Sequence, residues 1–116
     1  MSVYKIFHNP RCSKSKQTLQ LLKHNNCKIE IISYLEIDLK VSLIKELLKK
    51  LTLKPRDILR KGEQEYKDNN LKKDNLSEED LINYMIKYPK LIERPIVVKG
   101  DKAVIGRPPE KVLELI

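Results

Sequence analysis

The N-terminal third of the chain changes its hydrophobic periodicity twice, which limits the folds open to it. Residues 3–7 form a short apolar segment typical of a β-strand. Residues 13–23 carry two leucines three positions apart, which predicts a helix that an Asn-Asn pair then ends. Residues 29–34 are again apolar and predict a second, largely buried strand. A β-α-β unit is therefore expected at the start of the chain.

The middle of the chain is expected to be helical. Residues 41–51 keep an apolar spacing of three to four positions, and Pro55 suits the first turn of another short helix. Residues 66–75 are polar, which predicts a loop. Ser77 and Asp80 have the spacing of a capping box, so a further helix is expected to begin there and to end before Pro89.

The C-terminal part returns to strands. Residues 96–98 and 103–105 are short apolar segments around a predicted hairpin turn, and a final helix follows the prolines at 108 and 109. The full order is β-α-β, a helical insertion over about residues 38–90, and β-β-α. This order predicts a single domain, residues 1–116, with a thioredoxin-like α/β fold and an insertion between the second and third strands. In that fold a cis proline is expected at position 95.

Cys12 lies where the first expected strand gives way to the first helix. Pro10 ends the strand, so the cysteine is placed beside unpaired backbone N–H groups and the positive end of the helix dipole. Arg11, Lys14 and Lys16 add positive charge nearby. Such surroundings lower a cysteine pKa from about 8.5 to roughly 3.5–7.5. A buried structural cysteine is the alternative, but the polar neighbours favour a reactive thiolate.

The residues after Cys12 narrow its chemistry. A tyrosine-phosphatase-type phosphate loop needs an arginine six positions later, where this chain has Thr18, so that class is excluded. A dithiol C-x-x-C motif needs a second cysteine where this chain has Ser15. The motif is therefore monothiol, and an external thiol must release any adduct that forms on Cys12.

Composition indicates the compartment and the partners. The chain has 116 residues, a formal net charge of +8 and two cysteines. It shows no apolar segment long enough to cross a membrane and no secretory signal, and a working thiol fits a reducing cytoplasm. Its lysines are mostly scattered singly, so no nucleic acid is expected as a partner. Neither a metal nor another tightly bound cofactor is expected, because Cys12, Cys27, His8 and His24 lack zinc-type spacing.

Arginine is scarce in this chain, which has 19 lysines and only 5 arginines. Where lysine is the default cation, each arginine is a candidate for a task that lysine performs poorly, such as binding a planar oxyanion through a rigid fork of donors. A surface salt bridge explains any single arginine, but the joint placement of several at element ends favours oxyanion binding. The five are Arg11, Arg56, Arg60, Arg94 and Arg107.

Three segments together resemble one family. They are residues 8–15, His-Asn-Pro-Arg-Cys-Ser-Lys-Ser; residues 93–98, Glu-Arg-Pro-Ile-Val-Val; and residues 105–110, Ile-Gly-Arg-Pro-Pro-Glu. Their sequences and relative spacing resemble the glutathione/glutaredoxin-coupled arsenate reductases over nearly the whole chain. The sequence is similar to a shorter subgroup that lacks the C-terminal extension of the best-known members.

The resemblance implies a reaction and a site. It implies that Cys12 is the nucleophile and that Arg60, Arg94 and Arg107 bind the oxyanion. Arsenate would be reduced to arsenite through a covalent adduct on Cys12, with glutathione as co-substrate. Glutaredoxin is the implied protein partner, because it would regenerate the thiol.

Two supporting residues and two rival functions complete these expectations. His8 is expected to hold Cys12 as the anion and Ser15 to hydrogen-bond its sulfur, although a turn-stabilising role explains either residue equally well. A related Spx-like transcriptional regulator is one rival, but Spx proteins carry a C-x-x-C switch that Ser15 breaks. The other is a glutathione-dependent thiol transferase without arsenate activity, which would have little use for three converging arginines.

Overall fold

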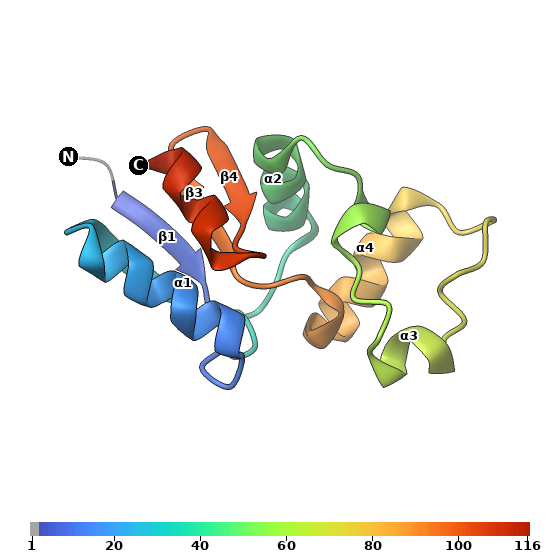
Figure 1. Cartoon of the computed structure of the whole chain (residues 1–116). Helices are drawn as coiled ribbons and strands as arrows, with labels where there is room; N and C mark the ends of the chain where they lie inside the picture. Colours follow the sequence, from blue (N-terminus) through green and yellow to red (C-terminus); the bar gives the residue numbers. More distant parts are fainter. Residues whose placement is uncertain (1–2) are drawn as a thin grey trace. The chain divides into compact units, whose positions relative to one another are not determined.

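In the computed structural model, which describes residues 3–116, a four-stranded mixed sheet organises the two ends of the chain (Figure 1). The strand order is β2-β1-β3-β4; β1 and β2 pair in parallel, and β3 runs antiparallel to both β1 and β4. The β-α-β…β-β-α order expected of a thioredoxin-like fold is confirmed. The strands are β1 (Val3–Phe7), β2 (Lys28–Ile32), β3 (Ile96–Lys99) and β4 (Lys102–Ile105).

Contacts within the chain define two units, which we call the sheet unit and the helical unit. The sheet unit contains residues 3–37 and 94–116 of the described chain, and the helical unit contains residues 38–93. The peptide bond between Arg94 and Pro95, where the sheet unit resumes, is cis, as the fold predicts. Within residues 3–116, no helix combines the length and the apolar character needed to span a membrane.

Two helices pack side by side in the sheet unit (Figure 1). Helix α1 (Ser13–His24) connects β1 to β2, and the 3₁₀ helix η3 (Pro109–Leu115) follows β4. Burial of each large apolar side chain between the helices and the sheet stabilises the fold by about 1.5–3 kcal/mol. This core fixes the start of α1 against the end of β1, where Cys12 lies. Its buried members are Tyr4, Ile6, Leu22, Val97, Val112 and Leu115.

The helical unit is built around α4 (Glu78–Lys87), which contacts α2 (Val41–Leu51) and two 3₁₀ helices. The capping box predicted at the start of α4 is confirmed. Ser77 Oγ accepts a hydrogen bond from the Asp80 N–H at 3.1 Å, and Asp80 Oδ2 accepts one from the Ser77 N–H at 3.0 Å. The remaining elements of the unit are η1 (Pro55–Ile58), α3 (Gln64–Asp68) and η2 (Pro89–Leu91).

Two local predictions are wrong. The second strand was expected to be largely buried, but β2 lies at the edge of the sheet, and both Glu30 and Ile31 are exposed. Its apolar composition therefore reflects β propensity more than burial. Residues 66–75 were expected to form a loop, yet α3 extends into this segment and buries Tyr66. A single buried aromatic residue anchors this short helix, and so the polar pattern around it was misleading.

Candidate active site

Asn9 shapes the turn that presents Cys12. Its backbone carbonyl accepts a hydrogen bond from the Cys12 N–H at 3.0 Å, and its side-chain Oδ1 accepts one from the Arg11 N–H at 3.0 Å. Asn9 is itself buried. The turn leaves Cys12 with an extended backbone at the N-cap of α1. The sulfur is thereby held at the helix N-terminus, where backbone N–H groups lack helical partners.

His8 and Ser15 brace the same turn. Ser15 Oγ accepts a hydrogen bond from the Asn9 N–H at 3.1 Å and lies 2.6 Å from His8 Nδ1. Both residues are buried. Burial lowers the pKa of His8, and the charges of Lys23 and Lys16 lower it further. The ring is therefore mainly neutral at pH 7, and in that form Nδ1 can accept a hydrogen bond from the Ser15 hydroxyl group. The roles expected for these two residues toward the sulfur stay predictions.

Two of the scarce arginines reach Cys12. Arg107 Nη2 lies 3.5 Å from Cys12 Sγ, and Arg107 Nε donates to the backbone carbonyl of Arg94 at 2.8 Å. The Arg94 side chain also hydrogen-bonds the sulfur. Arg94 precedes the start of β3 and Arg107 follows the end of β4. Because these strands pair antiparallel with Ile96 opposite Ile105, both arginines lie at the same end of the hairpin. The thiol is therefore flanked by two guanidinium groups from segments far apart in sequence.

These surroundings change the acidity of Cys12. Partial burial raises the pKa of the thiol, whereas hydrogen bonds from the Ser15 N–H and the Arg94 side chain lower it. The charge of Arg107 and the Lys14 N–H act in the same direction, so the net pKa is lowered. The thiolate is the nucleophilic form of cysteine. Cys12 is only half-buried, which leaves the sulfur open to a reactant.

Tyr34 is a member of this site that sequence reasoning missed. Its side chain is 2% exposed, and it interacts electrostatically with Arg94. Burial lowers the pKa of Arg94, but Tyr34 and Cys12 together outweigh it and raise the pKa. Arg94 is therefore charged and held between a phenol and the thiol. Asn9 was also missed, although an Asn just before a Pro is a recognisable turn signal.

Gly106 lets α1 approach the segment that carries Arg107. A Cβ at this position would collide with Thr18 Oγ1 and lie 2.9 Å from Pro95 Cγ. Thr18 is fully buried on α1, and its Oγ1 donates to the Lys14 carbonyl at 2.8 Å. The absence of a side chain at residue 106 thus allows the helix and the arginine-bearing segment to pack closely.

Arg60 belongs to the helical unit. There its Nε lies 3.7 Å from a carboxylate oxygen of Glu63, and its Nη1 lies 3.7 Å from one of Glu93. The structure thus brings Arg94 and Arg107 to Cys12, and a contribution of Arg60 to the oxyanion site stays a prediction.

The remaining two arginines have different surroundings. The guanidinium group of Arg56 hydrogen-bonds the backbone of the same chain. Its Nη1 donates to the Leu71 carbonyl and its Nη2 to the Lys73 carbonyl, each at 2.8 Å. It therefore fastens the segment after α3. Arg11 is exposed beside the cysteine.

The geometry defines a chemical capability. A thiolate at a helix N-terminus, flanked by two forked cations, can accept a tetrahedral oxyanion and attack its central atom. Among residues 3–116, no group of three or more His, Cys, Asp or Glu side chains is arranged to hold a metal ion. The class of protein that this fold and site define is a thioredoxin-like α/β protein with a monothiol centre.

Comparisons with known proteins give the family. The ArsC family pattern matches residues 7–115, so this chain belongs to the ArsC family. It is 51% identical to the uncharacterized protein YfgD of Escherichia coli K12 over 97% of this chain and 95% of that protein. It is 43% identical to an arsenate reductase of Haemophilus influenzae, over 96% and 97% of the two chains. The solved arsenate reductase of Vibrio cholerae superposes with a TM-score of 0.96 at 44% identity, over 99% and 98% of the two chains.

Proposed function

We propose that this protein is a glutaredoxin-dependent arsenate reductase that uses glutathione as its co-substrate. The observation that carries the proposal is the convergence of Arg94 and Arg107 on the Cys12 sulfur at the start of α1. Arsenate reductases of similar sequence and structure support the choice of substrate. A thiol cycle of this kind suits a reducing cytoplasm, and we place the protein there.

The first step is formation of the adduct. Arsenate enters between the guanidinium groups of Arg94 and Arg107, which offset the repulsion between a dianion and a thiolate. The Cys12 thiolate attacks arsenic, so an S–As bond forms and an As–O bond breaks. The departing oxygen takes up protons and leaves as water. We propose that Arg60 adds a third guanidinium group when substrate is bound.

The second step transfers two electrons. The thiolate of glutathione attacks Cys12 Sγ, and the S–As bond breaks with its electron pair remaining on arsenic. Arsenic passes from the pentavalent to the trivalent state and leaves as arsenite. Cys12 is left in a mixed disulfide with glutathione. A thiolate of glutaredoxin then attacks the glutathione sulfur and returns Cys12 as a thiolate.

The proposal is tested by arsenate-dependent oxidation of NADPH in the presence of glutathione, glutaredoxin and glutathione reductase. We expect turnover that requires arsenate and both thiol components. Direct binding of arsenate or sulfate should accompany it and be lost in Arg94→Ala. A thiol transferase without arsenate activity would instead reduce a mixed-disulfide substrate and show no oxyanion binding. Absence of both turnover and oxyanion binding in the wild-type protein would exclude the proposed function.

A further inference from the structure

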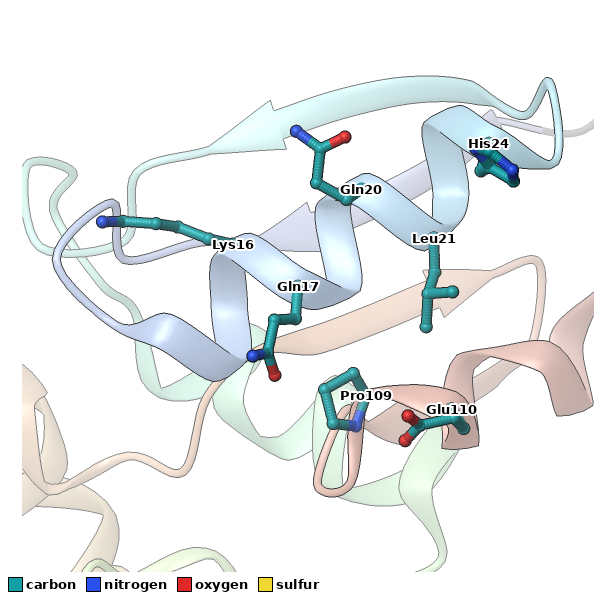
Figure 2. A pocket seen from close by; sticks show the side chains of 7 residues that line it. All are labelled: Lys16, Gln17, Gln20, Leu21, His24, Pro109 and Glu110. Carbon is teal, nitrogen blue, oxygen red and sulfur yellow. The ribbon is translucent and has the colours of Figure 1, made fainter.

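A groove lies between α1 and η3, both in the sheet unit. Figure 2 shows Gln17 and Leu21 pointing from α1 toward Pro109 and Glu110 at the start of η3, whereas the side chain of Lys16, another lining residue, extends away from these two. The groove has a volume of about 480 Å³. This lies within the range of roughly 300–1,000 Å³ that small-molecule sites occupy in proteins. The proposed reaction leaves this groove unassigned.

Each wall of the groove is close in sequence to a residue of the Cys12 site. On the α1 wall, the Lys16 N–H donates to the Cys12 carbonyl at 3.0 Å, one helical turn from the cysteine. On the other wall, Pro109 stands two residues after Arg107, whose Nη2 is 3.5 Å from Cys12 Sγ. The groove therefore begins at Lys16, one helical turn or about 6 Å along α1 from Cys12.

The length of the groove suits a short peptide. Its α1 wall runs from Lys16 to His24, eight residues further along the helix, which corresponds to about 12 Å at 1.5 Å per residue. An extended tripeptide spans about 10–11 Å. A tripeptide can therefore lie along the α1 wall of the groove.

The chemistry of the walls suits a zwitterion. Lys16 supplies a cation and Glu110 an anion, and within residues 3–116 neither forms an ion pair with another side chain. The Gln17 side chain offers an amide donor and acceptor. Leu21 and Pro109 provide apolar surface for the methylene groups of a ligand. Carboxylate, ammonium and amide groups on one small ligand would all find partners here.

We propose that this groove binds glutathione, whose carboxylates, single ammonium group and amides match these partners. The inference rests on the proposed function, because it locates the co-substrate of that reaction. The ammonium group pairs with Glu110 and a carboxylate pairs with Lys16. The thiol is thereby directed to Cys12 Sγ for the step in which the S–As bond breaks.

The test uses the full chain with S-methylglutathione, a thioether that binds without reacting. Backbone amide signals in ¹H–¹⁵N NMR spectra should shift on titration at Gln17, Leu21 and Glu110. Glu110→Lys should raise the dissociation constant about tenfold. Glu110→Gln, which keeps the shape of the side chain but removes its charge, should raise it about threefold. Glu114→Lys is the matched control, since Glu114 is exposed on the same helix outside the groove, and it should change the constant less than about twofold.

Several outcomes overturn the groove site. They are shifts confined to other residues, no binding at millimolar ligand, or equal effects of Glu110→Lys and Glu114→Lys. Turnover separates this inference from the proposed function. Glu110→Lys should raise the KM for glutathione and leave the KM for arsenate unchanged. If the wild-type protein reduces no arsenate but binds S-methylglutathione in the groove, the reductase proposal fails and the groove site stands.

Discussion

The two cysteines lie beyond opposite ends of α1, and the helix gives them opposite surroundings. Cys12 precedes the helix, where N–H groups and two guanidinium groups face its sulfur. Cys27 follows the C-terminal end, where its sulfur faces the Asn25 carbonyl at 4.0 Å. Both are free and half-buried, so exposure does not distinguish them. The helix dipole and the position of the arginines distinguish them, because only the N-terminal end of α1 favours an anion.

The largest expected difference in activity is between replacement of Cys12 and replacement of Cys27. Cys12→Ser should reduce arsenate-dependent NADPH oxidation to the background rate, because a serine hydroxyl is not ionised at neutral pH. Cys27→Ser should keep most of the activity. The coupled assay with glutathione and glutaredoxin measures both variants under the same conditions.

Mass spectrometry of the wild-type protein after arsenate and glutathione adds a direct check. A glutathione adduct on Cys12 is expected. An internal disulfide with Cys27 would contradict the monothiol cycle. The intervening helix of 12 residues holds its ends about 18 Å apart, whereas a disulfide needs Cα atoms within roughly 7 Å.

The second prediction concerns the guanidinium group of Arg94 beside Cys12. Arg94→Lys keeps the charge but replaces parallel donors with a point charge, so kcat/KM for arsenate should fall about tenfold or more, at about 1.4 kcal/mol per tenfold. Arg11→Lys is the matched control, because Arg11 adjoins the cysteine but is exposed. Near-wild-type kinetics for Arg94→Lys would mean that charge alone, and not fork geometry, binds the oxyanion.

The sequence was sufficient for the elements that carry the site. The periodicity of residues 3–34 predicted β1, α1 and β2. The scarcity of arginine singled out five residues, of which Arg94 and Arg107 flank Cys12. The contacts that complete the site join distant segments. Tyr34 meets Arg94 only after folding, and nothing in its local sequence marks it as a partner. Burial of β2 was overestimated because sequence shows apolar character but not which strand lies at an edge.

The third prediction measures the acidity of Cys12 in a Cys27→Ser background, where only one thiol reacts. Because the pKa of Cys12 is lowered, alkylation by iodoacetamide should stay fast as pH falls below the usual thiol value of about 8.5. Arg107→Ala removes a charge that lowers this pKa. The rate at pH 7 is then expected to fall by about three- to tenfold. An unchanged pH profile would assign the acidity to the backbone N–H groups and Arg94.

The free energy of unfolding should also depend on the titration of Cys12. A thiol with a lowered folded-state pKa contributes stability that is fully present above its unfolded-state pKa and is lost as pH falls through the folded-state pKa. The free energy of unfolding should therefore rise with pH across that interval. Cys12→Ser should remove this rise, whereas Cys27→Ser should retain it. Urea denaturation at a series of pH values measures both.

The smallest expected effect on the reactivity of Cys12 comes from the packing of α1 against Gly106. Gly106→Ala would press a Cβ onto Thr18 and Pro95, so the free energy of unfolding should fall by about 1–3 kcal/mol. Gly62→Ala is the matched control, because nothing lies within 4 Å of its Cβ position, and it should stay within about 0.5 kcal/mol of wild type. Since Arg107 follows the glycine directly, the folded Gly106→Ala protein should also show slower alkylation of Cys12. A loss of stability with unchanged Cys12 reactivity would show that close packing of α1 holds the fold but does not position the guanidinium group.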